Sequence, residues 1–274
     1  MIRINNVDMS RKSFAKTLRA AGYDWAIVLR NSFKSALIPY WARIARRTGW
    51  LGEARYFLLN DWRKLDKARY PLMIERFMAL ASVPCAALPT PYPTPQLTVT
   101  AEDVQQTLSS LSVCKPLGPL LIVCPGAEYG AAKRWPAEHF AAVAKEKLQQ
   151  GWNVWLLGSS KERVITEEMN QLCGGRCTDF SGRTTLNQAI DLLSLATTVV
   201  CNDSGLMHIA AALGVQLVVL YGSSSAKFTP PLSERVNLLS LNLSCSPCFK
   251  RECPLQHLNC LRQLLPTRVL EVMD

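Results

Sequence analysis

The stretch "VVCNDSGLMHIAAALGV", residues 199–215, joins a β-branched apolar run to an alanine-rich run through a polar turn. The first run is typical of a buried strand and the last of a helix. A plain connector would suffice between them, yet the turn holds five polar or small residues: Asn202, Asp203, Ser204, Gly205 and His208. The stretch therefore predicts one strand-to-helix unit with a polar site at the end of the strand.

Strand-like and helix-like runs alternate through the rest of the second half. We expect strands at 120–123, 153–157, 198–201 and 216–221, and helices at 136–150, 161–172, 186–196 and 207–213. Alternation of this kind predicts βαβ units and a parallel, doubly wound α/β sheet. In such sheets ligands bind beyond the carboxyl ends of the strands.

A proline-rich stretch divides the chain. Residues 80–100 contain five prolines that oppose a regular helix and favour an extended linker: Pro84, Pro89, Pro91, Pro93 and Pro95. Ahead of it, the strand-like run 25–29 passes through a polar turn into a helix-like stretch, which is half of a βα unit. At 274 residues we expect two domains, 1–112 and 113–274, with the linker at about 82–112.

Charge and hydropathy narrow the class of partner. No apolar run approaches the roughly 18 residues that cross a bilayer, and residues 1–10 lack a signal-peptide pattern, so we expect a cytoplasmic protein. The net charge is +10, and residues 1–76 hold 16 Lys and Arg against 6 Asp and Glu. An anionic partner on the first domain fits this imbalance, and so does a solvated basic surface. Nucleic acid is disfavoured because no reader motif is present.

Three polar turns follow expected strands of the second half, so they should open on one edge of the sheet. They are "CPGAEYGAAKRWP" (124–136), "LGSSKE" (157–162) and "NDSGLMH" (202–208). In the third turn, N–H groups at the helix start together with His208 suit a diphosphate. The plain alternative is that Asp203 or Ser204 caps the helix.

The other two turns also allow two interpretations each. Lys133 places a cation just before a new helix, although a lone lysine is more often a surface residue. Glu162 suits ribose hydroxyls, or it is an ordinary carboxylate at a helix start. Neither G-x-G-x-x-G nor G-x-x-x-x-G-K-[ST] is present, so a nicotinamide, flavin or Walker phosphate site is not supported.

Ten cysteines without a secretion signal favour thiols or a metal over a disulfide framework. Six are scattered, several of them in apolar runs typical of core packing: Cys85, Cys114, Cys124, Cys173, Cys177 and Cys201. The other four, Cys245, Cys248, Cys253 and Cys260, are spaced C-x2-C-x4-C-x6-C around His257. They suit a structural zinc or an iron-sulfur cluster that staples a loop, although the spacing matches no standard finger and reduced thiols stay an alternative.

The motifs together resemble a known family. "PGAEYGAAKRWP" (125–136), "NDSGLMHIAAALG" (202–214), "LYGSSSAKFTPPLS" (220–233) and "CSPCFKRECPL" (245–255) are similar to the heptosyltransferases of lipopolysaccharide core assembly, glycosyltransferase family 9. The likeness runs from about Arg11 to the C-terminus and includes residues 31–61. It implies a GT-B fold of two Rossmann-like domains, the sugar nucleotide on the second and the lipid acceptor on the first.

The resemblance also implies roles for single residues. It implies that Asp203 contacts the sugar, that Lys133 neutralises the leaving diphosphate, and that Glu162 binds ribose. Thr184, in "GRTTL", falls where the family's backbone meets adenine. Ser204, Gly205 and His208 match the residues that hold the diphosphate. No catalytic metal is implied.

The implied reaction moves L-glycero-D-manno-heptose from ADP-heptose to heptosyl-Kdo-lipid A, as the second heptose of the inner core. It inverts the anomeric carbon and releases ADP, at the inner face of the cytoplasmic membrane. Lys34, Arg46, Arg47 and Arg55 are candidates to meet the acceptor's phosphates and carboxylates.

One departure from the family pattern affects the first domain. The family opens with a strand and a glycine-aspartate loop that carries the general base, and Met1 falls about 70 residues after that point if a domain has about 150 residues. We therefore expect an incomplete first domain without that base. The alternative function is a fragment that binds ADP-sugar without transferring it.

Overall fold

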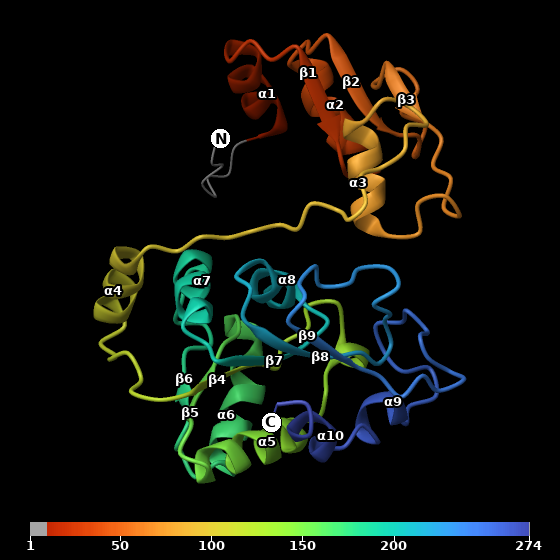
Figure 1. Cartoon of the computed structure of the whole chain (residues 1–274). Coiled ribbons are helices and arrows are strands. Elements are labelled where there is room, and N and C mark those ends of the chain that lie inside the picture. The colour runs from red at the N-terminus through yellow and green to blue at the C-terminus, as the bar shows by residue number, and fades with distance from the viewer. Residues whose placement is uncertain (1–9, 274) are drawn as a thin grey trace. The chain divides into compact units, whose positions relative to one another are not determined.

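The computed structural model describes residues 10–273, which form two compact units. The first contains the chain up to Tyr92 together with Lys227–Thr229, and the second contains Pro93–Ala226 and the chain from Pro230 onward (Figure 1). None of the described helices is long and apolar enough to cross a bilayer.

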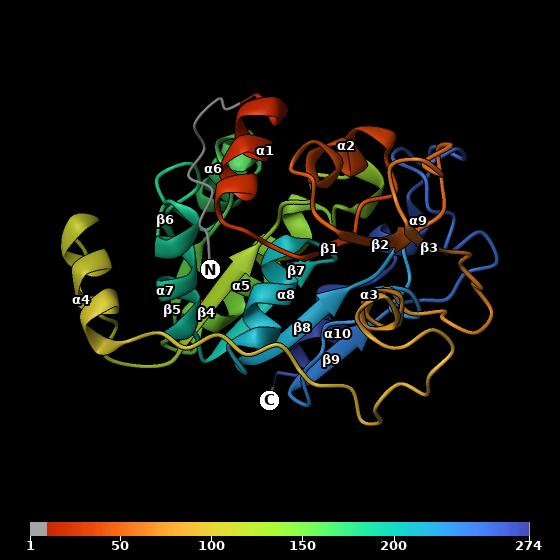
Figure 2. The same cartoon turned by 90° about the horizontal axis from the view of Figure 1, so that it is seen from above.

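The second unit is built on a six-stranded parallel sheet in the order β6-β5-β4-β7-β8-β9 (Figure 2). The chain passes from β4 outward to β5 and β6, then returns to the other side of β4 to form β7. A crevice therefore opens between the carboxyl ends of β4 and β7, where the winding direction reverses. The strands are β4 (Leu120–Cys124), β5 (Asn153–Leu156), β6 (Thr178–Asp179), β7 (Thr198–Asn202), β8 (Gln216–Leu220) and β9 (Val236–Leu239).

Helices cover both faces of this sheet, because its strands are apolar on both sides. In β4, Leu121 and Val123 belong to the apolar cluster of one face, whereas Ile122 and Cys124 belong to that of the other. Figure 1 shows α7 and α8 above the sheet, with α5 and α10 below it. The helices are α4 (Ala101–Ser110), α5 (Ala137–Gln149), α6 (Arg163–Leu172), α7 (Leu186–Ser194), α8 (Gly205–Ala212), α9 (Asn259–Arg262) and α10 (Pro266–Leu270).

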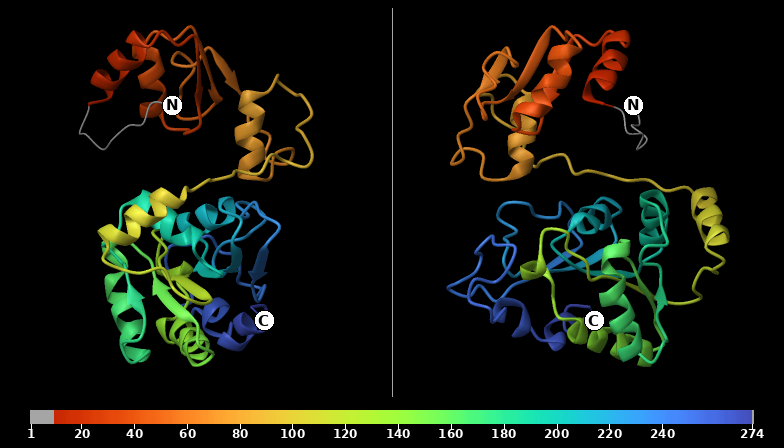
Figure 3. Two further views of the ribbon diagram at one scale, coloured as in Figure 1. Left: turned by 60° about the vertical axis from the view of Figure 1, so that its left-hand side comes forward. Right: turned by 180° about the vertical axis from the view of Figure 1, so that it is seen from behind.

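The first unit is the smaller of the two (Figure 3). It has a three-stranded parallel sheet in the order β1-β2-β3. Its core consists of three small apolar clusters, one of which packs Trp50 against Tyr70 and Leu80. Its elements are α1 (Arg11–Ala20), β1 (Trp25–Val28), α2 (Phe33–Trp41), β2 (Arg46–Trp50), β3 (Asp61–Arg63) and α3 (Met73–Ala81). Parallel sheets in both units confirm the expected α/β class.

The division between the units falls inside the expected linker, but not at its end. The linker was expected to reach residue 112, yet α4 is a helix that packs on α7 of the second unit. Thr107 Oγ1 donates to Asp191 Oδ2 at 2.6 Å, and Leu108 is buried in that unit's core. Within the expected linker, all five prolines precede α4, and the stretch that holds them is free of helix.

Trp135, two residues before α5, belongs to the core of the second unit. It is 2% exposed, meets Phe140 edge to face at 4.9 Å between ring centroids, and donates Nε1–H to the Leu264 carbonyl at 2.8 Å. We expect Trp135→Ala to lower the free energy of unfolding by about 3–5 kcal/mol, since it opens a cavity and orphans a buried carbonyl.

Urea denaturation followed by circular dichroism measures this loss. Val164→Ala, at a side chain that is 74% exposed in the same unit, is the matched control and should change stability by less than about 0.5 kcal/mol. Equal effects of the two substitutions would contradict the assignment of Trp135 to the core.

Candidate functional site

The three polar turns converge on one cavity of about 600 Å³ in the second unit. Its wall takes residues from the turns after β4, β5 and β7 and from the start of α7. This is the crevice that the strand order creates, and its size suits a nucleotide-sized ligand. Of the expected site residues, four line it directly: Glu162, Thr184, Ser204 and Gly205.

The start of α8 gives this cavity a set of free backbone donors. Ser204 occupies the N-cap position in an extended conformation, but its side chain makes no capping hydrogen bond. Asp203 does not cap the helix either, because its carboxylate pairs with Lys133. The plain capping interpretation is thus wrong for both residues. The first N–H groups of α8 have no partner within the helix, and Ser204 and Gly205 at this helix start line the cavity.

Lys133 and Asp203 form an ion pair beside the cavity rather than in its wall. Lys133 Nζ lies 2.5 Å from Asp203 Oδ2, and the two side chains are 17% and 6% exposed. The ammonium also stands 5.0 Å from the centre of the Tyr129 ring. Because Asp203 directly precedes Ser204, the pair sits where the first and third turns meet.

His208 lies one turn into α8 and is exposed. Partial desolvation lowers its pKa; the Asp203 carboxylate acts in the opposite direction and the Lys133 ammonium in the same direction. The imidazole is therefore mainly neutral at pH 7, with one N–H to donate.

Glu162 caps a turn and also lies in the cavity wall. Its Oε2 accepts a hydrogen bond from the Ser159 N–H at 2.8 Å and a short one from the Ser159 hydroxyl, so it caps the turn before α6. It also lines the cavity. Gly126 lets it approach, since a Cβ there would lie 2.7 Å from Glu162 Cγ.

Asn202 is a structural residue of the site that sequence reasoning named in the turn but gave no role. Its side chain is fully buried; Nδ2 donates to the Pro125 carbonyl at 2.7 Å, and Oδ1 accepts from the Trp135 N–H at 3.1 Å. One amide thus ties the end of β7 to both ends of the turn after β4. The signal available in the sequence was a polar residue, Asn202, at the end of an apolar strand.

Two of the four basic residues expected to meet the acceptor are structural. Arg55 is fully buried, and burial lowers its pKa; its guanidinium donates to backbone carbonyls, including that of Arg30 at 2.6 Å. Arg47 donates to the carbonyls of Leu58 and Ile44 at 2.8 and 2.6 Å. The expectation that they meet the acceptor was wrong for both, because these side chains donate hydrogen bonds to backbone carbonyls in turns of their own unit.

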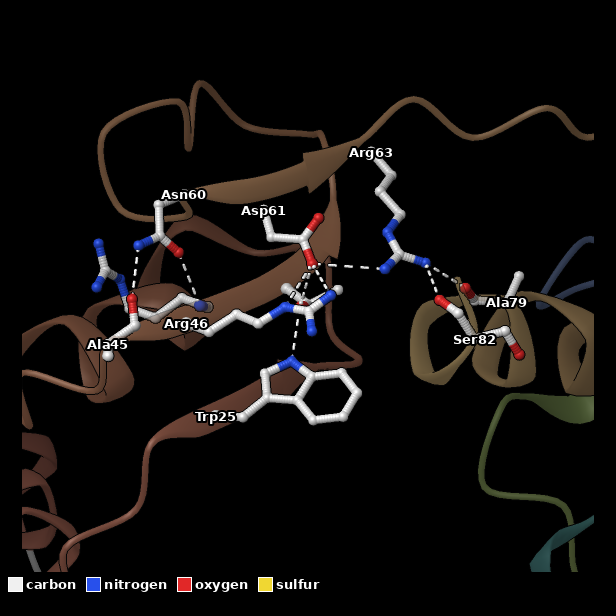
Figure 4. Close-up of polar contacts among 10 residues, drawn as sticks. Trp25, Ala45, Arg46, Asn60, Asp61, Arg63, Ala79 and Ser82 are labelled. Carbon is white, nitrogen blue, oxygen red and sulfur yellow. Dashed lines mark hydrogen bonds and ion pairs between the residues drawn. The ribbon is translucent and has the colours of Figure 1, made fainter. Parts of the chain in front are cut away.

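Arg46 belongs to a network at the edge of the first unit's sheet (Figure 4). Its guanidinium pairs with Asp61 at 2.8 Å and stacks on the Trp25 ring at 4.5 Å. Arg63 approaches the same carboxylate at 3.4 Å. Half of the Arg46 side chain stays exposed, so it and the exposed Lys34 are the candidates that remain for an anionic partner.

The scattered cysteines follow the expected packing only in part. Cys124, Cys173, Cys177 and Cys201 are buried, whereas Cys85 and Cys114 are exposed. Cys124 and Cys201 pair across β4 and β7, and burial raises the pKa of Cys124 to about 12. Burial also raises the pKa of Cys201, so these two thiols stay protonated and act as small apolar side chains.

Comparison with known proteins identifies the family. The sequence profile of glycosyltransferase family 9 (heptosyltransferase) matches residues 11–259. The chain belongs to glycosyltransferase family 9. Lipopolysaccharide heptosyltransferase 2 of Escherichia coli K12 is 42% identical over 273 residues, which are 96% of this chain and 78% of that protein. Lipooligosaccharide heptosyltransferase 2 of Haemophilus influenzae Rd is 44% identical over 242 residues, 85% of this chain and 69% of that protein.

Solved structures of family 9 share the architecture. The structure of the E. coli ADP-heptose lipopolysaccharide heptosyltransferase II superimposes with a TM-score of 0.85 at 41% identity, covering 96% of this chain and 79% of that one. A family 9 glycosyltransferase from Veillonella parvula superimposes with a TM-score of 0.73 at 20% identity, covering 84% and 66%, which shows the fold alone. The GT-B type expected from the resemblance is confirmed.

The ion pair of the family 9 site yields a stability prediction. We expect Lys133→Met to cost about 2–4 kcal/mol, because it leaves the nearly buried Asp203 carboxylate unpaired. Lys133→Met combined with Asp203→Leu should recover part of that loss, since no orphan charge is left.

Urea unfolding of the two single variants and the double variant gives the coupling free energy. Lys161→Met is the control, since its pair with Glu128 at 3.8 Å is highly exposed. Additive losses from Lys133→Met and Asp203→Leu would contradict a direct interaction.

Proposed function

We propose that this chain transfers L-glycero-D-manno-heptose from ADP-heptose to the inner core of lipopolysaccharide, as its second heptose, and releases ADP. One observation carries the proposal: the 600 Å³ cavity joins the uncapped start of α8 to the oriented carboxylate of Glu162. The first suits a diphosphate and the second suits ribose hydroxyls. Membership of family 9 and the similarity to lipopolysaccharide heptosyltransferase 2 support the choice of heptose and acceptor.

Each part of the donor has a proposed contact. The backbone at Thr184 meets adenine, and Glu162 binds the ribose. The N–H groups of Ser204 and Gly205, with the His208 imidazole, hold the diphosphate. This order follows the cavity wall from the start of α7 to the start of α8.

The reaction we propose is an inverting displacement at the anomeric carbon. The acceptor hydroxyl forms the new glycosidic bond and releases its proton to solvent, while the bond to the diphosphate breaks and its electron pair leaves with ADP. Lys133 and the N–H groups of α8 stabilise that growing negative charge. Asp203 holds Lys133 in place and contacts the sugar. We assign the deprotonation of the acceptor to no residue of this chain.

The acceptor side and the location are proposals too. An inner core with phosphates and carboxylates suits the basic first unit, through Lys34 and the exposed half of Arg46. Because that acceptor is a lipid, we propose that the protein works in the cytoplasm at the inner face of the membrane.

A transfer assay tests the function. Purified chain is mixed with ADP-heptose and heptosyl-Kdo-lipid A, the product is read by mass spectrometry, and ADP binding is measured by calorimetry on the same sample. Transfer with ADP release is the expected result. Binding of ADP without transfer would overturn the proposed activity while keeping the donor site, and the absence of both would overturn both.

The role of Glu162 predicts a change in donor affinity. Glu162→Gln keeps an acceptor for Ser159 but loses the charge, so we expect KM for ADP-heptose to rise roughly tenfold with little change in kcat. Steady-state kinetics measure both constants. Glu128→Gln is the control, because Glu128 lines the same cavity with its side chain 91% exposed. A similar rise in KM for both variants would argue against a specific contact at Glu162.

The lowered pKa of His208 predicts proton uptake on donor binding. A bound diphosphate adds negative charge and therefore raises the pKa of His208. The affinity for ADP should then increase as the pH falls from the pKa of the ADP-bound protein towards the lower pKa of the free protein. Calorimetry in two buffers of different ionisation enthalpy measures the uptake. His208→Gln should remove the histidine's share and leave only the titration of ADP itself. Equal uptake by both proteins would show that His208 does not contact the diphosphate.

A further inference from the structure

The four clustered cysteines, which the proposed reaction does not use, share one small cavity. Cys245, Cys248, Cys253 and Cys260 all line a space of about 20 Å³ in the second unit, together with His257. Cys260 is buried and the other three are half-buried. A space of this size accommodates one ion or one water.

A second polar group lines the same cavity without a partner. The Ser223 hydroxyl is buried, at 1% exposure, and its Oγ has no hydrogen-bond partner among the described residues. Unpaired buried hydroxyls are rare because desolvation is costly. A hydroxyl in this position can donate to a metal-bound thiolate, which is a common outer-shell contact.

The backbone between the cysteines is irregular. Phe249, directly after Cys248, has φ +53°, and Gln256 and Leu258 have φ +56° and +52°. Residues other than glycine seldom adopt these left-handed conformations, which cluster at turns and ligand sites.

His257 is a weaker candidate ligand than the thiols. Its Nδ1 accepts a hydrogen bond from the Asn259 N–H at 3.0 Å, so the neutral ring carries its proton on Nε2. If Nε2 bound a metal, the proton of the neutral ring would move to Nδ1. A protonated Nδ1 could no longer accept the hydrogen bond from the Asn259 N–H. The four sulfurs are therefore the natural donor set, and tetrahedral tetrathiolate sites select zinc or iron.

We propose that Cys245, Cys248, Cys253 and Cys260 bind one thiophilic metal ion, with zinc as the ion expected. Each S–H loses its proton to solvent, so binding releases four protons and leaves a zinc tetrathiolate of net charge −2. Basic residues around the cluster, Lys250, Arg251 and Arg262, outnumber the single acidic one, Glu252, and offset this charge.

Binding has to draw the sulfurs together. Within residues 10–273, no three His, Cys, Asp or Glu side chains already stand at the spacing of a metal site. Coordination is therefore coupled to ordering of the loop, which is usual for small structural metal sites. The ion would tighten a segment that already encloses its position on several sides.

Elemental analysis of the full chain, purified under reducing conditions without chelator, tests the proposal. We expect about one zinc per chain, and a loss of at least tenfold in Cys248→Ser/Cys253→Ser. Cys114→Ser, at an exposed cysteine of the same unit, is the matched control and should keep the metal. Because metal content is measured without turnover, this result is independent of the proposed function.

Cobalt substitution adds a readout of ligand type. The reduced chain titrated with Co²⁺ should develop thiolate charge-transfer absorption that saturates at one equivalent and disappears with zinc. One tightly held iron per chain that is lost in the double variant would keep the site and change the ion. Metal content below a tenth of an equivalent after zinc reconstitution, or equal content in the double variant, would overturn the proposal.

Discussion

The site depends on one buried amide. Asn202 closes β7, and its two side-chain atoms hold the Pro125 carbonyl and the Trp135 N–H. The excursion of chain between those residues carries Lys133, so a single side chain clamps both of its ends. Loss of the amide would leave a buried donor and a buried acceptor unpaired, at about 1–3 kcal/mol each. The clamp works only because β4 and β7 are neighbours, which the reversal of strand order ensures.

The position of the ion pair follows from that clamp. Asp203 is the next residue after Asn202, so its carboxylate emerges where the clamped excursion returns. A carboxylate that is 6% exposed needs a cation, and Lys133 supplies it at 2.5 Å. With Asp203 engaged and Ser204 not capping, the start of α8 keeps its unpaired N–H groups. The end of β7 therefore determines both features: the free N–H groups of α8 and the position of Lys133 in its ion pair.

Sequence predicts the features that depend on periodicity and misses those that depend on burial. In the second unit, β4, β5, β7, β8 and the helices α5 to α8 could be placed because apolar runs alternate with polar turns, whereas the short β6 and the peripheral β9 were not predicted. The three turns meet as parallel strands require. Charge, in contrast, does not reveal partners: Arg55 and Arg47 looked available but bind carbonyls of their own turns. The helix α4 was hidden beside the prolines, because its helical pattern is short and polar. Asn202 carried a weak signal, since a strand-ending polar residue has many ordinary explanations.

The clamp fixes the ends of the excursion, but its middle needs another support, and the cysteine-rich segment provides it. Tyr129 donates its hydroxyl to the Phe249 carbonyl at 2.9 Å, and the Ala132 N–H donates to the Arg251 carbonyl at 3.0 Å. The approach is so close that a Cβ on Gly130 would lie 2.3 Å from the Arg251 oxygen.

The support itself lacks regular structure, since no helix or strand lies between Leu239 and Asn259. Irregular segments longer than about 12–15 residues are uncommon in compact domains, and many of those that occur are functional. The placement of Lys133 then depends on the order of that segment. The metal ion proposed for its four cysteines would keep the segment ordered, because coordination constrains the loop without burying more apolar surface.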